Sequence, residues 1–394
     1  MSTFSALRRS NSPPTSGQRQ LMGPPGVLAA LVLFLVLRLT GVAVVVAVDH
    51  LTGRTAGKSL AHSWDAVWYL HIAEYGYGTR TRITGSGAVQ TDWAFFPLYP
   101  GLVRGLRDLV PISAGKAGLL IAWSAAVLAA YGIYAIGHHL YRRAVATTLV
   151  ALWAALPHSV ILTLAYTEPV FTACAAWSLY AVLRGRWLTA GSLAALAGLA
   201  RPNGIAVAVA VVAAAVHEVV RQRGRVPRGL WAGALLSPLG WTGYVLWVGR
   251  QAGDLLHGYF HVQSAWNSRL DLGVGSLRSM KSLLLHGGKV TFPMTVVVVA
   301  ASILLFCLLC LDRAPLPLVI FAGVLLLLVL AVSGPFSSKP RFLLPAFPLL
   351  IPLARALVRA WRSSLARAVL VGGTLATVSV AYGVYLAVLS REPL

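Results

Sequence analysis

The chain has 394 residues, of which 57% are hydrophobic and only 11% are charged, and its mean hydropathy is +0.74. Soluble proteins carry about a quarter charged residues, so this composition excludes a soluble globular protein and predicts a polytopic membrane protein. Lysine and arginine number 33 against 11 acids, which gives a formal net charge of +22. The basic residues lie in short clusters between apolar segments, so they indicate cytoplasmic loops and anionic lipid, and no nucleic-acid partner is expected.

The N-terminal segment, residues 1–22, is polar and contains Pro13-Pro14, and it is predicted to be a disordered cytoplasmic tail. The apolar run from about Val27 to Val48 is too long for the hydrophobic region of a signal peptide, so it should remain as the first transmembrane helix. Arg38 lies inside this run, where a charge costs roughly 2.5–3.5 kcal/mol on insertion scales. We therefore expect Arg38 to face the bundle or a water-filled cavity.

Apolar segments recur along the rest of the chain and predict ten further spanning helices, about eleven in all. They lie near 113–137, 145–162, 168–183, 187–200, 204–220, 229–249, 291–311, 315–333, 342–358 and 366–388. The segment at 187–200 is short enough for a broken or re-entrant helix. The predicted fold is therefore an all-α polytopic bundle, a single domain over residues 23–394 with two long loops at about 49–112 and 250–290.

The distribution of arginines predicts the orientation. If the N-terminus is cytoplasmic, one side collects Arg8, Arg9, Arg19, Arg142, Arg143, Arg184, Arg186, Arg221, Arg223, Arg225, Arg228, Arg313, Arg359, Arg362 and Arg367. The positive-inside rule then places the N-terminus inside and both long loops outside a cell membrane. Six polar motifs fall on that outer face, at 64–77, 94–104, 166–171, 201–204, 261–267 and 339–345. Their convergence predicts one extracytoplasmic site on a helical bundle.

The first long loop carries an acid between two tryptophans, in Trp64-Asp65-Ala66-Val67-Trp68-Tyr69. Trp and Tyr prefer the membrane–water boundary, and an acid held there can have its proton affinity tuned. Asp65 is therefore the expected chemical centre. We expect a helix within 64–77, a flexible insert at 79–91, and a short interfacial helix after Phe96.

These motifs resemble a known family. Trp64-Asp65-x-x-Trp68-Tyr69-x-x-Ile72-Ala73-x-x-Gly76-Tyr77, followed by Ala94-Phe95-Phe96-Pro97-Leu98-Tyr99-Pro100 and Arg104, is similar to the PIG-V-type mannosyltransferases. In eukaryotes these enzymes add the second mannose to the GPI anchor precursor, and they belong to the GT-C superfamily. The later motifs that resemble the family are Tyr166-Thr167-Glu168-Pro169-Val170-Phe171, Arg201-Pro202-Asn203-Gly204, Gln263-x-x-Trp266 and Lys339-Pro340-Arg341-Phe342-x-x-Pro345.

The resemblance implies a GT-C fold, a polyprenyl-phosphate-mannose donor and an acceptor hydroxyl. It also implies an acidic residue in the loop after the first helix, which here is Asp65. The Ala-, Arg- and Val-rich composition suggests a bacterial chain. Because bacteria do not make GPI anchors, the acceptor stays unassigned.

Sugar transfer from a lipid phosphate needs a base, positive charge for the leaving phosphate, and an apolar groove for the lipid tail. Asp65 is the expected base, and a single carboxylate suits direct displacement with inversion. The residues expected to bind the donor phosphate or sugar are Arg201, Arg341, Lys339, Arg104, Glu168 and Asn203. The residues expected to contact acceptor or sugar are Trp64, Trp68, Tyr69, Asp92, Phe96, Gln263 and Trp266. The sequence has no Asp-x-Asp pair and no histidine cluster, so no metal or other cofactor is indicated.

Structural interpretations compete with each of these roles. Asp65 could cap a helix or hold the loop through a salt bridge, and the aromatic residues could be interface anchors. Arg201 could be a snorkelling charge, and Glu168-Pro169 could be a helix start. Gln263 and Trp266 could belong to an ordinary polar loop.

Two other functions remain open from the sequence. One is a glycosyltransferase that uses another lipid-linked sugar or glycosylates protein. The other is a lipid or sugar transporter. Transporters place polar residues near mid-membrane, often in repeated halves, whereas this chain has no evident internal repeat and its polar motifs gather at one surface.

Overall fold

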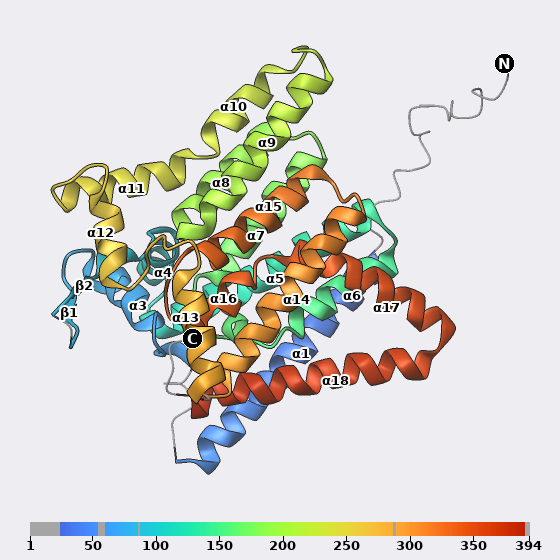
Figure 1. The fold of residues 1–394 in the computed structure, drawn as a ribbon, viewed down its shortest axis with the longest axis horizontal. Coiled ribbons are helices and arrows are strands. Elements are labelled where there is room, and N and C mark those ends of the chain that lie inside the picture. The colour runs from blue at the N-terminus through green and yellow to red at the C-terminus, as the bar shows by residue number, and fades with distance from the viewer. Residues whose placement is uncertain (1–23, 54–59, 86, 287–288, 391–394) are drawn as a thin grey trace.

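The computed structural model describes residues 24–53, 60–85, 87–286 and 289–390, and over these ranges the chain is almost entirely helical (Figure 1). This confirms the expected all-α fold class. The tail at 1–22 lies outside the described residues. In the described part, β1 (Thr81–Ile83) pairs antiparallel with β2 (Val89–Thr91). This hairpin lies within the segment at 79–91 that was expected to be a flexible insert, and the N–H of Thr84 donates to Ala88 O at its turn.

Within the described ranges, five helices are long and apolar enough to cross a membrane, counting α9 with the short turn before it and α18 with the turn after it. They are α1 (Pro24–Leu51), α5 (Ala114–Leu140), α9 (Ile205–Arg221), α14 (Thr291–Leu311) and α18 (Leu365–Val384). Four shorter apolar helices are α6 (Arg143–Ala154), α7 (Glu168–Leu183), α8 (Trp187–Ala200) and α15 (Leu316–Ala331). The others are α3 (Ala66–Tyr75), α4 (Leu98–Leu109), α10 (Arg228–Leu236), α11 (Leu239–Gln251), α12 (Gly258–Ala265), α13 (Val274–His286), α16 (Lys339–Leu343) and α17 (Ile351–Ser363).

The predicted apolar segments are largely helical, but among the described residues five helices pass the length and composition test, or up to six if one bent pair counts as a span. The four shorter helices have 12 to 16 residues, against about 20 for a straight crossing. The predicted span at 229–249 is divided into α10 and α11, because Pro238 lacks an N–H and interrupts the helix.

The bent pair lies near the C-terminal end and not at 187–200, where α8 is an unbroken helix. Phe336–Leu343, which contains α16, meets Phe347–Trp361 at 76°. Most side chains at this break are buried. Irregular backbone at membrane depth is tolerated where protein surrounds it, as it does here.

Arg38 lies on the side of α1 that faces the bundle. Its side chain is buried, and its guanidinium donates to Ala154 O at the end of α6. The expectation that this arginine avoids lipid is therefore confirmed.

Helix α8 packs against α10 and α11 through glycines. A Cβ at Gly240 would lie 1.9 Å from Ala195 O, and one at Gly191 would lie 2.2 Å from Gly233 O. No side chain fits at these positions, so the backbones approach as they do in small-residue packing of membrane helices.

We expect Gly240→Ala to destabilise this packing by about 1–3 kcal/mol, because the added methyl group overlaps the Ala195 carbonyl and forces the helices apart. Gly243→Ala is the matched control. Gly243 is on the same helix as Gly240, but a Cβ at this position would meet no atom within 4 Å. Thermal unfolding in detergent would measure both variants. Equal melting temperatures would contradict the close contact.

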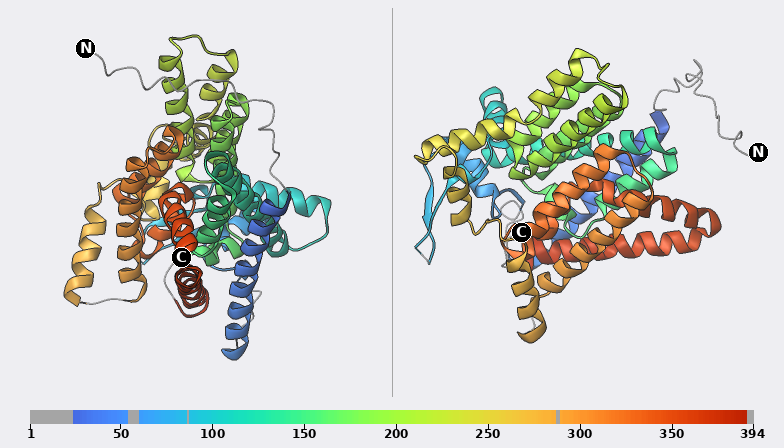
Figure 2. Two further views of the ribbon diagram at one scale, coloured as in Figure 1. Left: turned by 90° about the vertical axis from the view of Figure 1, so that its right-hand side faces the viewer. Right: turned by 45° about the horizontal axis from the view of Figure 1, so that its top comes forward.

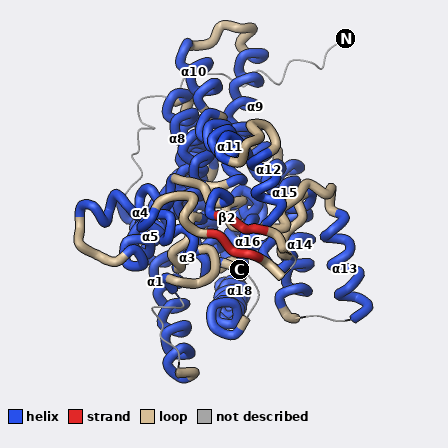
Figure 3. The backbone as a smooth tube through the Cα atoms, turned by 90° about the vertical axis from the view of Figure 1, so that its left-hand side faces the viewer, coloured by secondary structure: helices blue, strands red, loops and turns tan. Residues whose placement is uncertain are grey.

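Helix α13 lies beside α14 on the outside of the bundle (Figure 2). The two long loops also meet each other, at the end of the molecule that carries the hairpin (Figure 3). Gln263 Nε2 donates to Ala94 O at 3.1 Å, and Trp266 Nε1 donates to Thr91 O at 3.2 Å. The loops that were predicted to share one face are thus in direct contact.

Candidate active site

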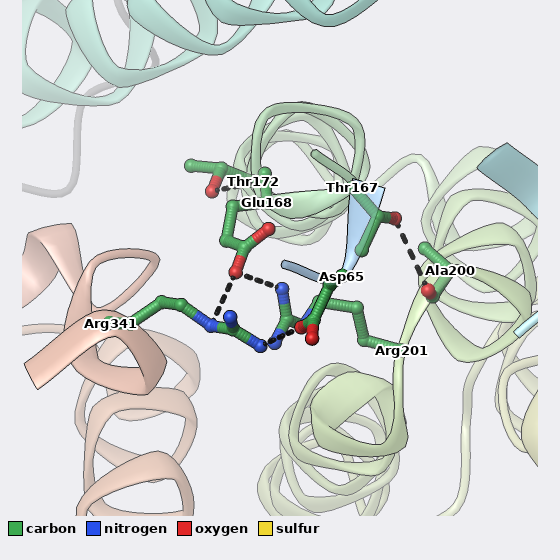
Figure 4. A network of polar contacts seen from close by, with 7 residues as sticks. All are labelled: Asp65, Thr167, Glu168, Thr172, Ala200, Arg201 and Arg341. Carbon is green, nitrogen blue, oxygen red and sulfur yellow. Dashed lines mark hydrogen bonds and ion pairs between the residues drawn. The ribbon is translucent and has the colours of Figure 1, made fainter. Parts of the chain in front are cut away.

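Four charged side chains from four separate segments meet inside the bundle (Figure 4). They are Asp65, Glu168, Arg201 and Arg341. Each belongs to a motif that the sequence assigned to the outer face, so four of the six motifs converge. The cluster holds two carboxylates and two guanidiniums, and its formal charges cancel.

Asp65 stands at the N-cap position of α3, but its side chain makes no capping hydrogen bond. Oδ2 of Asp65 instead lies 2.5 Å from Nη2 of Arg341, so the salt-bridge interpretation holds and the capping one does not. Trp64 has a φ of +47°, which is uncommon for a bulky residue. Such backbone strain concentrates at functional sites, and here it directly precedes the acid.

Glu168 is the first residue of α7, and Pro169 follows in the first turn, as the sequence suggested for a helix start. The negative charge is favourable at a helix N-terminus. Its side chain is fully buried, and Oε1 contacts both Arg201 Nη1 and, at 2.9 Å, Arg341 Nε. Glu168 is therefore both a helix start and the centre of the cluster.

Arg201 is positioned by the proline after it. Because a residue before proline is excluded from the helical region, α8 ends at Ala200 and Arg201 is extended, with φ −156° and ψ 158°. Thr167 Oγ1 donates to Ala200 O at 3.3 Å and ties this helix end to the start of α7. Arg201 is 5% exposed and paired with Glu168, so the snorkelling interpretation was wrong.

Arg341, on α16, joins the two acids. Its guanidinium carbon also lies 5.4 Å from the ring centroid of Tyr166 and 5.2 Å from that of Phe342, and the Phe342 ring lies 5.5 Å from the guanidinium of Arg201. Aromatic faces attract such cations. Tyr166 and Phe342 stood in the predicted motifs without a role, and their only sequence signal was their position next to charged site residues.

The two acids differ in accessibility. The Asp65 side chain is 26% exposed, whereas that of Glu168 is 0% exposed and the two guanidiniums are at most 7% exposed. Asp65 is thus the most exposed member of the cluster. In the part of the chain that the structure describes, no three His, Cys, Asp or Glu side chains are grouped closely enough to hold a metal ion.

Tyr69 lies near all four charges but is not suited to be the base. Burial raises the pKa of its hydroxyl well above the usual value, and the charge of Arg201 only partly opposes this. The phenol therefore stays protonated at neutral pH.

The aromatic residues that were expected to contact sugar pack mostly against one another. Trp68 stacks on Phe95 with centroids 5.5 Å apart and meets Trp266 edge-on at 5.0 Å. Phe96 is fully buried against Tyr244, at 4.4 Å. These aromatic contacts join α3 to both long loops, and direct sugar contact by these residues stays a prediction.

Asp92 and the polar side chains of the second loop are occupied in holding the loops. The Asp92 carboxylate accepts backbone N–H groups from Gly78, Thr79 and Arg80 at 3.0–3.3 Å, and it is fully buried. The side-chain N–H groups of Gln263 and Trp266 already bond to carbonyls of the first loop. Their predicted sugar contacts would require these bonds to be shared or exchanged.

The remaining predicted residues lie around the cluster or apart from it. Trp64 is 40% exposed beside Asp65, and Asn203 is half-buried in the turn after Arg201. Arg104 is exposed on α4 and forms no ion pair with any described residue. Lys339 Nζ donates to Val329 O and, at 2.8 Å, to Val332 O, so it caps the end of α15.

Two solved structures of the archaeal oligosaccharyltransferase AglB from Archaeoglobus fulgidus are similar to this chain. The structure in complex with an inhibitory peptide and a dolichol-phosphate has a TM-score of 0.52 and 13% identity, over 92% of this chain and 56% of that chain. The structure in complex with Zn and sulfate has a TM-score of 0.50 and 14% identity, over 91% and 54%. The chain thus spans about half the length of these structures.

At this identity the likeness concerns the fold alone. No protein-family model matches the chain, and no curated protein matches it. The similarity to AglB, a GT-C superfamily member, supports the GT-C-like fold and does not single out the PIG-V-type family. The chain has the fold of a GT-C-like polytopic membrane protein.

Proposed function

We propose that this chain is a membrane mannosyltransferase that transfers mannose from a polyprenyl-phosphate-mannose donor to an acceptor hydroxyl on the extracytoplasmic face. The observation that carries the proposal is the buried cluster in which one accessible carboxylate, Asp65, stands beside two arginines. Such an arrangement offers a base and a phosphate-binding charge at one place. The PIG-V-like motifs supply the choice of mannose.

In the proposed reaction, Asp65 accepts the proton of the acceptor hydroxyl while the oxygen of that hydroxyl attacks the anomeric carbon of the donor sugar. The new C–O bond forms while the bond from the anomeric carbon to the phosphate oxygen breaks. Polyprenyl phosphate leaves with that electron pair, and the anomeric configuration inverts. A single accessible carboxylate suits this direct displacement, since retention would require a second close nucleophile.

Arg341 links the two halves of this reaction. In the free protein its Nη2 is paired with Asp65 at 2.5 Å. When Asp65 takes up the acceptor proton, it loses its negative charge and its hold on the guanidinium weakens. Arg341 can then turn its donors to the phosphate that is gaining charge, with Arg201 beside it.

The lipid-linked donor is the part of the proposal that the fold neighbour supports. AglB was solved with a dolichol-phosphate, which is a polyprenyl-type phosphate. A related lipid on this chain agrees with its apolar helices and with the arginines of the cluster. The acceptor hydroxyl belongs to a lipid-glycan or to a protein.

The test is transfer of labelled sugar in membranes that contain the full chain. Polyprenyl-phosphate-mannose, polyprenyl-phosphate-glucose and a nucleotide-linked mannose would be supplied separately, with lipid extracts and proteins of the native host as acceptors. We expect label to move only from the polyprenyl-phosphate mannose and only with an intact Asp65. Transfer from the glucose lipid instead would mean that the donor sugar is glucose and not mannose. Passage of the intact lipid across the membrane without transfer would favour a transporter.

A further inference from the structure

An apolar groove of about 450 Å³ lies between α13, α14 and the end of α15 (Figures 1 and 2 show the three helices). Its walls include Leu277 and Met280 from α13, Val296 and Ala300 from α14, and Leu327 from α15. Several of these side chains are exposed at the protein surface, so the groove opens sideways. Its volume falls within the about 300–1,000 Å³ of small-molecule sites.

One end of the groove is polar. Lys339 lines it there, with its ammonium at the last carbonyls of α15. Two of its three N–H donors meet those carbonyls, which leaves capacity for one further acceptor. The hydroxyl of Ser276 also lines this groove, and it is buried without a hydrogen-bond partner.

The helix that forms the outer wall is basic. Arg278 and Lys281 are exposed on α13, and its sequence contains no acid. Asp271, just before α13, has its carboxylate turned to the backbone N–H groups of Gly273 and Gly275. Arg278 and Lys281 do not line the groove themselves, so the charge inside it comes from Lys339. The groove therefore combines an apolar trough with one ammonium, which complements an anionic head on a hydrocarbon tail.

We infer that this groove holds the hydrocarbon tail of a polyprenyl phosphate, with the phosphate at the Lys339 end. The inference rests on the proposed function, because it names the place of the donor and product lipid. Ordinary phospholipid tails also fill apolar grooves in a membrane. The buried ammonium of Lys339 and the unpartnered hydroxyl of Ser276 are what favour a compact phosphate without a glycerol backbone.

The short helix α16 connects the groove with the charged cluster. Lys339 and Arg341 are two residues apart on this helix, so they project to different sides. Lys339 lines the groove, while Arg341 pairs with Asp65 and Glu168. A lipid phosphate at Lys339 would thus lie on the same helix as the arginine that serves the reaction.

Photo-crosslinking of the purified full chain tests the inference, with a photoactivatable polyprenyl phosphate that carries no sugar. We expect labelled peptides from α13 and α14, and we expect Ala300→Trp to reduce the labelling about tenfold because the indole fills the groove. Ala301→Trp is the matched control, since the neighbouring alanine is exposed on α14 and does not line the groove. Met280→Trp, on the opposite wall, repeats the test should the first variant fold poorly.

The head group is tested by competition. An uncharged polyprenol and a phosphatidylglycerol should compete about tenfold less well than unlabelled polyprenyl phosphate, and Lys339→Met should remove this preference. Labelling that is unchanged in both tryptophan variants, or that all three lipids displace equally, would overturn the inference.

Sugar transfer separates this result from the proposed function. If the wild-type chain is labelled in the groove but transfers no sugar, the lipid site is supported and the proposed transferase activity is not. Full sugar transfer by Ala300→Trp would contradict the groove as the site of the donor lipid and would leave the proposed transferase activity unaffected.

Discussion

Asp65→Asn is expected to slow sugar transfer by about 10²–10⁴-fold, the usual contribution of a general base. Asparagine keeps the shape of the side chain, and its carbonyl oxygen can still accept the hydrogen bond from Arg341 that Asp65 now accepts at 2.5 Å. It cannot take up the acceptor proton. Transfer of labelled mannose under saturating donor would measure the loss, which should fall on kcat and leave donor binding nearly unchanged.

Glu74→Gln is the matched control for this variant. Glu74 is also an acid of α3, but it pairs at the surface with Arg107 at 3.6 Å and lies outside the cluster. The same change of acid to amide should leave transfer unaltered there. If Asp65→Asn instead weakens donor binding as strongly as it slows transfer, Asp65 is an anchor for Arg341 and another group is the base.

The parts of the site that the sequence predicted best are those that local rules fix. Pro202 ends α8 and sets the extended backbone of Arg201, and Pro169 marks the helix start at Glu168. The apolar segments and the positive-inside rule then predicted that these helix ends lie on one face of the membrane. The same rules could not show that Glu168 lies between two arginines, because that contact joins segments far apart in the chain.

The contacts of the other predicted site residues depend on tertiary packing, which local sequence rules do not give. Lys339 and Arg341 were both expected to bind the donor phosphate or sugar, but Lys339 lies at the end of α15 whereas Arg341 pairs with Asp65. Asp92 was expected to contact acceptor or sugar, yet its carboxylate accepts three backbone N–H groups of the first loop. Apolar composition alone also does not distinguish a helix of 12 to 16 residues from one that is long enough for a straight crossing.

The second large effect is expected at Glu168→Gln, which should destabilise the protein by about 3–5 kcal/mol, because it leaves buried arginine charge uncompensated. Oε1 of Glu168 contacts both Arg201 and Arg341, and its side chain is fully buried. Removing this charge leaves two cations with the single carboxylate of Asp65. Apparent melting temperatures in detergent, taken at one scan rate, would measure the loss.

Two further variants give this result its meaning. Glu218→Gln removes the acid of an exposed pair with Arg221 on α9, at 2.7 Å, and should change stability by no more than about 1 kcal/mol. Glu168→Gln combined with Arg201→Gln removes one charge of each sign, so it should be less destabilised than Glu168→Gln alone. A double variant that loses the sum of both single effects would mean that Glu168 and Arg201 act independently. The cluster would then be a set of separate contacts, and the arginines would not depend on Glu168 to remain buried beside Asp65.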